Sequence, residues 1–137
     1  MVKRFLEIRP PIAAVIPEFQ SIIDEIEHAY VLGYPFAALS ASCVSTERLL
    51  NLARIQLHKH HPKIKDLWNK GPLNEWDGNI EALEQWGYFD AALSVELKWV
   101  FRNIRCKYLH SGEITDLASD ALRAVQAAYR VLCWAYR

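Results

Sequence analysis

Residues 90–109 read DAALSVELKWVFRNIRCKYL, and the spacing of their apolar residues points to the fold class. Apolar side chains recur every three or four positions along this stretch, at Leu93, Leu97, Val100, Ile104 and Tyr108. This period places them on one face of an α-helix, and we expect that face to be buried. Ser111 and Gly112 follow directly and predict the end of the helix.

Four further segments have the same period, and none after residue 17 alternates as a strand does. They run from Pro17 to a stop at Gly33, from Pro35 to about His58, from about Asn79 to Trp86, and from about Asp116 onward. The second of them is predicted to bury Phe36, Leu39, Cys43, Leu50, Ala53 and Leu57. The residues between His58 and Asn79 are predicted to be irregular. We therefore predict an extended segment over 1–16 and an all-α domain over 17–137, a four- to five-helix bundle with antiparallel, up-down helices.

The composition fits one domain, and the balanced charges exclude a strong overall electrostatic field. Of 137 residues, 52% are apolar, which is enough for one hydrophobic core. Sixteen basic residues balance sixteen acidic ones, so a polyanion could be bound only by a local cluster. The three cysteines are widely spaced and suggest reduced thiols. No stretch resembles a signal peptide or a membrane span, so we expect a cytoplasmic protein without membrane contact.

The local cationic cluster lies at the end of the stretch quoted first. Residues 97–113, LKWVFRNIRCKYLHSGE, contain no free acid before Glu113 and five groups that can carry positive charge, Lys98, Arg102, Arg105, Lys107 and His110. Arginine presents a planar fork to anionic oxygens, and an imidazole exchanges protons near neutral pH. The cluster therefore favours a phosphate ligand.

Arg105 and His110 are separated by four residues, and this spacing resembles the motif of the HEPN superfamily (higher eukaryotes and prokaryotes nucleotide-binding domains). The order of the surrounding segments is also similar to an uncharacterised prokaryotic branch of that superfamily. It comprises ALSASCVSTERLLNLA (38–53), NIEALEQWGYFD (79–90), the cationic stretch and a closing amphipathic helix. The resemblance covers roughly residues 18–137 and implies a HEPN-like helical fold.

The resemblance implies a homodimer that cuts RNA without metal or cofactor. His110 would act in general acid/base catalysis and Arg105 would stabilise charge on the phosphate. Arg102, Asn103, Lys107 and Glu47 are predicted to support the site or bind substrate. Many active members have Asn directly after the arginine, where this chain has Cys106.

Other interpretations of these residues stay open. Arg105 is as well suited to an ion pair with Glu47, and His110 to a cation that stabilises the helix end. On an ideal helical wheel Arg102, Asn103 and Cys106 lie opposite the buried face with His110, so Arg102 could replace Arg105 beside His110.

One tryptophan and three histidines are interpreted without a part in catalysis. Trp99 shares the outward face and is predicted to anchor an interface. His58, His60 and His61 lie in a polar segment and are expected to be solvated rather than to bind a metal.

Three functions follow from these patterns. The first is a HEPN-like RNA-binding domain or metal-independent endoribonuclease, used as a toxin or a phage-defence component, with a cognate antitoxin or nucleotidyltransferase as partner. The second is a catalytically inactive HEPN-like module for dimerisation or partner binding. The third is an unrelated helical bundle with a chance motif.

Overall fold

The computed structural model describes residues 3–4, 17–58, 76–109 and 113–135, and within them every regular element is helical. The elements are α2 (Pro17–Val31), α3 (Pro35–His58), α5 (Trp76–Gln85), α6 (Ala91–Val100), the π-helical turn η1 (Phe101–Arg105), α7 (Cys106–Leu109) and α8 (Leu117–Ala135). No strand occurs in this part of the chain, which confirms the all-α prediction. Apart from two helical residues, Lys3 and Arg4, the predicted segment 1–16 lies outside the described residues.

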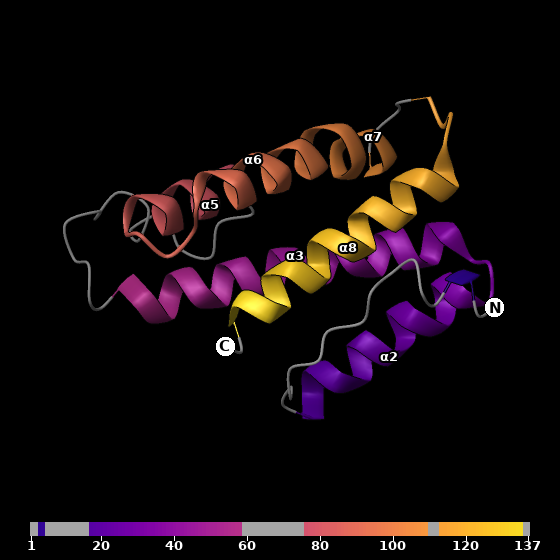
Figure 1. Cartoon of the computed structure of the whole chain (residues 1–137), viewed down its shortest axis with the longest axis horizontal. Helices are drawn as coiled ribbons and strands as arrows, with labels where there is room; N and C mark the ends of the chain where they lie inside the picture. The colour runs from indigo at the N-terminus through magenta and orange to yellow at the C-terminus, as the bar shows by residue number, and fades with distance from the viewer. Residues whose placement is uncertain (1–2, 5–16, 59–75, 110–112, 136–137) are drawn as a thin grey trace.

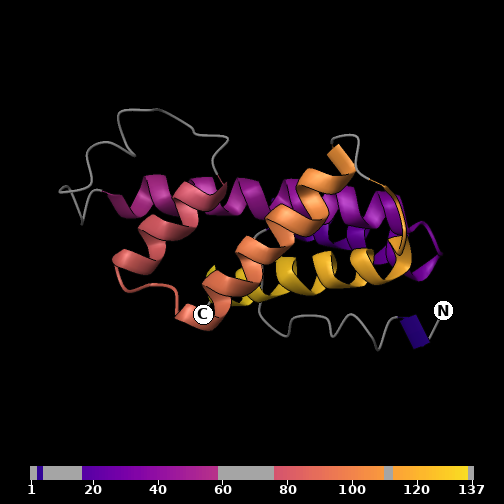
Figure 2. The ribbon, with the colours of Figure 1, turned by 90° about the horizontal axis from the view of Figure 1, so that it is seen from above.

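Helix α3 is the centre of the arrangement, because it packs along α8 and also contacts α2, α5 and η1. Figure 1 shows α3 and α8 running in the same direction, whereas α2 and α6 run the opposite way. Seen from above, α6 and its continuation cross diagonally over α8 and α3 (Figure 2). Accordingly α6 contacts α8, and η1 contacts α3. The crossing brings the cationic stretch onto the central helix.

The core is built from the stripes that the periodicity predicts. Every long helix contributes side chains with 2% exposure or less, among them Ile26, Leu39, Leu50, Leu97, Ile104 and Leu132. Burying an aliphatic side chain of this size stabilises the fold by about 1.5–3 kcal/mol relative to leaving it exposed. The apolar period of the sequence therefore identifies the faces that hold the helices together.

The prediction that Phe36 of α3 is buried in the core is wrong. Phe36 is 52% exposed, and its ring centroid lies 6.5 Å from that of Tyr108. Phe36 lies in the first turn of α3, at the end of the bundle where α2 passes into α3 (Figure 1). Periodicity identifies the inward face of a helix, but it cannot say at which turn the neighbouring helices stop covering that face.

Most of the predicted helix ends are confirmed. Gly33 and Gly87 follow α2 and α5 with φ of 87° and 83°, a left-handed conformation that ends a helix at low cost for glycine. At the start of α6 the carboxylate of Asp90 accepts a hydrogen bond of 2.7 Å from the backbone N–H of Leu93. This is the N-cap geometry that short polar side chains favour.

Helix α5 begins earlier than predicted. It starts at Trp76, whereas residues 76–78 were expected to be irregular. Trp76 is fully buried, and its indole N–H donates to the carbonyl of Leu97 at 3.0 Å. This contact with α6 is tertiary, so the local sequence gives no sign of it. Residues 59–75 of the same predicted segment, including His60 and His61, lie outside the described residues.

Candidate functional site

Two residues of the cationic stretch, Arg102 and Arg105, lie on a π-helical turn rather than on a regular α-helix. In η1 the backbone N–H of Cys106 donates to the carbonyl of Phe101, five residues back, so the turn is one residue wider than an α-turn. An ideal α-helical wheel therefore gives wrong angles between the residues before η1 and those after it. Within η1 it still predicts correctly that Arg102 and Asn103 are exposed and that Ile104 is buried. Single π-turns within α-helices occur frequently at functional sites.

Arg105 points from η1 to α3 and pairs with Glu47, as one interpretation of the sequence predicted. Its Nε lies 3.0 Å from Oε2 of Glu47 and its Nη2 lies 3.4 Å from Oε1. The two side chains are only 19% and 16% exposed. The guanidinium carbon also lies 5.3 Å from the ring centroid of Phe101, within reach of a cation–π interaction. Two of the five guanidinium N–H groups are thus engaged, and the others can still donate to a ligand.

Arg102 and Asn103, the supporting residues next to it, point elsewhere. The side chain of Arg102 is 67% exposed and reaches Asp77 of α5 at 3.5 Å. Asn103 donates from Nδ2 to the carbonyl of Trp99, one turn back on its own helix, at 3.0 Å. Arg102 therefore remains largely available to an anion in solvent, whereas the amide of Asn103 is partly engaged.

Lys107 belongs to a separate polar cluster that joins α7 to α8. Its ammonium lies 3.0 Å from Oδ2 of Asp120 and 3.3 Å from Oγ1 of Thr115. The same carboxylate oxygen accepts a hydrogen bond of 2.7 Å from the hydroxyl of Tyr108, whose pKa is raised by burial and by that carboxylate. The charge of Lys107 is therefore matched within the fold, which makes it a poor ligand for phosphate.

A shallow groove along α3 adjoins the Arg105–Glu47 pair. It has a volume of about 540 Å³ and is lined by Val44, Glu47, Arg48, Asn51, Leu52, Ile55 and Arg105. Arg48 is exposed and forms no hydrogen bond or ion pair with another described residue. The groove thus adds a free guanidinium to the one that Glu47 holds.

Asn51 is held in the groove from behind by two buried polar side chains. Arg54 is fully buried, and its Nε donates to Oδ1 of Asn79 on α5. The Nδ2 of Asn79 in turn donates to Oδ1 of Asn51 at 2.8 Å. Because Oδ1 of Asn51 is the acceptor, its NH₂ group is left to donate to a ligand. Burial also lowers the pKa of Arg54.

Sequence reasoning missed Arg48, Asn51 and Arg54. Val44, Arg48, Asn51 and Ile55 follow one another at helical spacing, so periodicity places them together on the solvent side of α3. The helical spacing could therefore have identified Arg48 and Asn51 as neighbours on one face. No local pattern marks Arg54 as buried, because arginine is rarely fully buried and its partner comes from α5.

The remaining predicted residues divide into covered and undescribed ones. One face of the Trp99 ring is covered by the guanidinium of Arg123, which lies 3.4 Å from the ring centroid and pairs with Glu96. His110, the predicted acid/base group, lies outside the described residues. In the part of the chain that is described, no group of three His, Cys, Asp or Glu residues is placed to hold a metal ion. No described helix is long and apolar enough to cross a membrane.

Searches of protein-family models, of curated proteins and of solved structures each returned no match to this chain.

Proposed function

We propose that the chain is a HEPN-like RNA-binding domain that holds phosphate in the α3 groove and cleaves RNA without metal. The observation that carries the proposal is the convergence of N–H donors on one depression. Among the described residues, neither the guanidinium of Arg48 nor the NH₂ group of Asn51 has a hydrogen-bond acceptor, and Arg105 is held beside them by Glu47. Guanidinium and amide N–H donors suit the oxygens of a phosphodiester, and Glu47 lines the same groove as the partner of Arg105.

The arrangement of the helices is compatible with the HEPN-like up-down bundle. The four long helices alternate in direction along the chain, with α2 and α6 opposite to α3 and α8 (Figure 1). Arg105 of the motif lies within the π-turn η1, which contacts α3. The proposal therefore places the chemistry where two helices that are distant in sequence meet.

In the proposed reaction the ribose 2′-oxygen attacks the adjacent phosphorus and the bond to the 5′-oxygen breaks. The products are a cyclic phosphate and a 5′-hydroxyl. His110 removes the proton from the 2′-hydroxyl, and Arg105 stabilises the negative charge that builds on the phosphate oxygens. In the proposed homodimer a second copy of the motif supplies the imidazole that protonates the leaving 5′-oxygen.

The test compares the purified protein with its variants on fluorescently labelled single-stranded RNA in EDTA. Cleavage should persist in EDTA and should be lost in His110→Ala, with cyclic phosphate ends on the products. Comparison of cleavage by Arg102→Ala and by Arg105→Ala shows which arginine stabilises the phosphate. Activity that survives in all three variants would assign cleavage to a contaminant and overturn the nuclease proposal.

Binding to RNA is tested separately from cleavage. Arg48→Gln should weaken binding of a non-cleavable RNA and lower the slope of log affinity against log salt by about 0.7, as expected for one lost phosphate contact on a single strand. The matched control is Arg123→Gln, which removes the same charge where Glu96 pairs with it. An equal loss in both variants would mean that only net charge matters.

A specific observation favours the inactive module as the second candidate. Glu47 forms a two-point pair with Arg105, which neutralises the charge that catalysis requires, and Cys106 replaces the Asn of many active members. This candidate predicts that RNA or a protein partner, such as a cognate antitoxin or nucleotidyltransferase, is bound without any cleavage. The assay in EDTA distinguishes the two.

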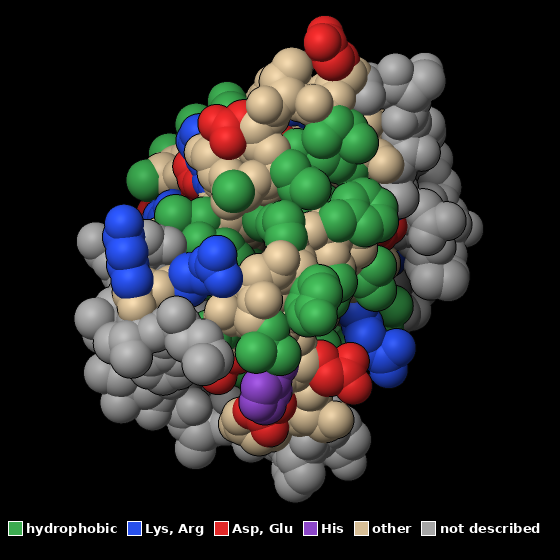
Figure 3. Space-filling model, turned by 90° about the vertical axis from the view of Figure 1, so that its right-hand side faces the viewer, with side chains coloured by type: hydrophobic (Ala, Val, Ile, Leu, Met, Phe, Trp, Pro, Cys, Tyr) green, Lys and Arg blue, Asp and Glu red, His purple; other side chains and the backbone are tan. Residues whose placement is uncertain are grey.

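The proposed homodimer has a candidate surface in addition to Trp99. Exposed apolar side chains gather at the end of the molecule where α2 passes into α3 (Figure 3), including Leu32, Tyr34 and Phe36 at 56%, 63% and 52% exposure. Val44, which lines the α3 groove, is also exposed, at 66%. Sedimentation at tens of micromolar should give a dimer. A monomer would remove the two-copy site from the proposed mechanism.

A further inference from the structure

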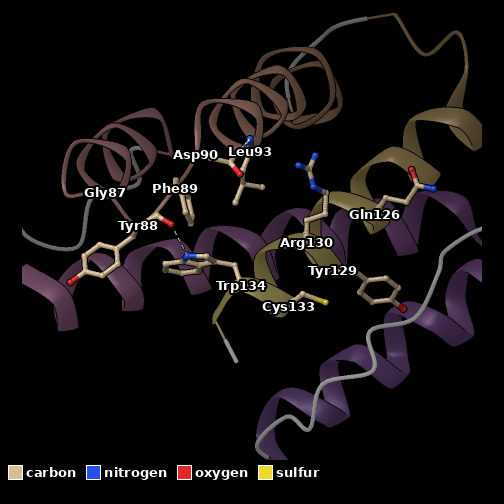
Figure 4. A pocket seen from close by; sticks show the side chains of 10 residues that line it. All are labelled: Gly87, Tyr88, Phe89, Asp90, Leu93, Gln126, Tyr129, Arg130, Cys133 and Trp134. Atoms are coloured by element: carbon tan, nitrogen blue, oxygen red, sulfur yellow. Dashed lines mark hydrogen bonds between the residues drawn. The ribbon is translucent and has the colours of Figure 1, made fainter. Parts of the chain in front are cut away.

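A second pocket lies between α8 and the connection from α5 to α6, and it shares no lining residue with the α3 groove. Its volume is about 730 Å³, within the range of about 300–1,000 Å³ that is usual for small-molecule sites. Figure 4 shows the lining side chains, which come from the segment 87–93 and from α8 between Gln126 and Trp134. The RNA-binding proposal makes no use of this pocket.

One wall of the pocket is a fixed aromatic surface. The rings of Phe89 and Trp134 meet edge to face, with centroids 4.6 Å apart and planes at 78°. The indole N–H of Trp134 donates to the carbonyl of Tyr88 at 2.9 Å (Figure 4), which holds the ring in place. Phe89 and Leu93 are 4% and 7% exposed. A planar apolar group would therefore meet a wall that is already ordered, which lowers the entropic cost of binding.

The polar groups of the pocket differ in whether they already form hydrogen bonds within the protein. The carboxylate of Asp90 caps α6, and the hydroxyl of Tyr129 donates to Glu27 at 3.0 Å. Arg130 is exposed and forms no hydrogen bond or ion pair with another described residue. In Figure 4 its guanidinium extends from α8 across the pocket towards Leu93 on α6. Arg130 thus offers a cation with five donors, none of which is engaged by another described residue.

We propose that this pocket binds a small aromatic anion, with its ring against Phe89 and Trp134 and its carboxylate or phosphate on Arg130. A guanidinium can hold either anion through two parallel hydrogen bonds. Asp90 sets a limit on the ligand, because a second anionic group would approach the carboxylate that caps α6. The ligand class is therefore a planar ring with one anionic group.

The test uses three probes of the same shape, 1-naphthoate, 1-naphthyl phosphate and the neutral 1-naphthamide. Binding is followed on the indole N–H signal of Trp134 in ¹⁵N-labelled protein, assigned with Trp134→Phe. Both anions should shift this signal to saturation, and the amide should bind at least about tenfold more weakly because it lacks the charge-assisted contact. The ratio of the two anion affinities then shows whether carboxylate or phosphate is preferred.

Arg130→Gln should weaken both anions about tenfold or more, and Arg130→Lys should recover part of the affinity because it restores charge without the fork. Arg48→Gln is the matched control, since it removes the same charge at the α3 groove and should leave binding unchanged. Both arginines are exposed, so the variants should retain the circular dichroism spectrum of the parent. Equal binding of the amide, an unaffected Arg130→Gln, or no shift of the Trp134 signal would overturn the proposal.

Discussion

Arg105 and Lys107 lie two residues apart in the chain, yet their charges are held by different helices. Arg105 pairs with Glu47 of α3, and Lys107 pairs with Asp120 of α8. Both pairs are mostly shielded from solvent, whereas Arg48 is exposed and unpaired within the described residues. The charge of a residue in this stretch therefore says little about its role until its partner is known.

Arg105→Ala should lower the free energy of unfolding by about 1–3 kcal/mol, because it leaves the half-buried carboxylate of Glu47 without its donors. Arg48→Ala is the control on the same groove and should change stability by less than about 0.5 kcal/mol. Urea unfolding measures both. The double variant with Glu47→Ala should cost less than the sum of the single changes. Equal effects of the two arginine variants would show that the pair contributes nothing to the fold.

The three cysteines should react at different rates. Cys43 is buried in α3, and burial raises its pKa to about 12, whereas Cys106 and Cys133 are partly exposed. Because the thiolate is the reactive form, a disulfide reagent at about pH 8 should modify Cys106 and Cys133 and spare Cys43. Full reaction should require urea. Rapid modification of all three thiols in the folded protein would contradict the packing of α3.

At the scale of the element, η1 determines where the cationic residues point. A regular α-helix from Ala91 to Leu109 would place Arg102 and Arg105 at different angles around the axis, because the π-turn contains one extra residue. The segments before and after η1 still bury Leu97 and contact α8 through Tyr108, so the turn absorbs the extra residue between two anchored ends.

Deleting Asn103, which is exposed in η1, should convert the π-turn into an α-turn while leaving both anchored ends in register. We expect the melting temperature to stay close to that of the parent or to rise. Binding of a non-cleavable RNA should fall, because the angle between Arg102 and Arg105 around the helix axis then changes. The control is Asn103→Ala, which keeps the turn and should keep binding. Loss of folding in the deletion would show that the extra residue is required by the core.

For the whole molecule, two tyrosine hydroxyls join distant parts of the chain to acidic partners. Tyr108 of α7 donates to Asp120 of α8, and Tyr129 of α8 donates to Glu27 of α2. Burial and the neighbouring carboxylates raise the pKa of both phenols above the ordinary value of 10.0. The folded chain therefore holds these two protons more tightly than the unfolded chain does.

This difference predicts how stability depends on alkaline pH. The contribution of the two phenols is fully present below about pH 10, the value at which they titrate in the unfolded chain, and is lost progressively as the pH rises above it. Tyr129→Phe should cost about 0.5–1.5 kcal/mol at neutral pH and should make the alkaline decline shallower. Tyr34→Phe, at an exposed tyrosine, is the control. Urea midpoints measured from neutral to alkaline pH should separate the two variants, and parallel curves would contradict the prediction.

Apolar periodicity was enough to predict the all-α class, the stripes of the core and most helix ends, because each depends on residues close together in the chain. The α3 face with Val44, Arg48, Asn51 and Ile55 was also within reach of that signal. Tertiary contacts decided the rest. They started α5 at Trp76, buried Arg54 against Asn79, paired Arg105 with Glu47, and brought segment 87–93 to α8 as a pocket. Each of these joins residues at least 20 positions apart, and a local pattern cannot encode which distant side chain completes a hydrogen bond or covers a ring.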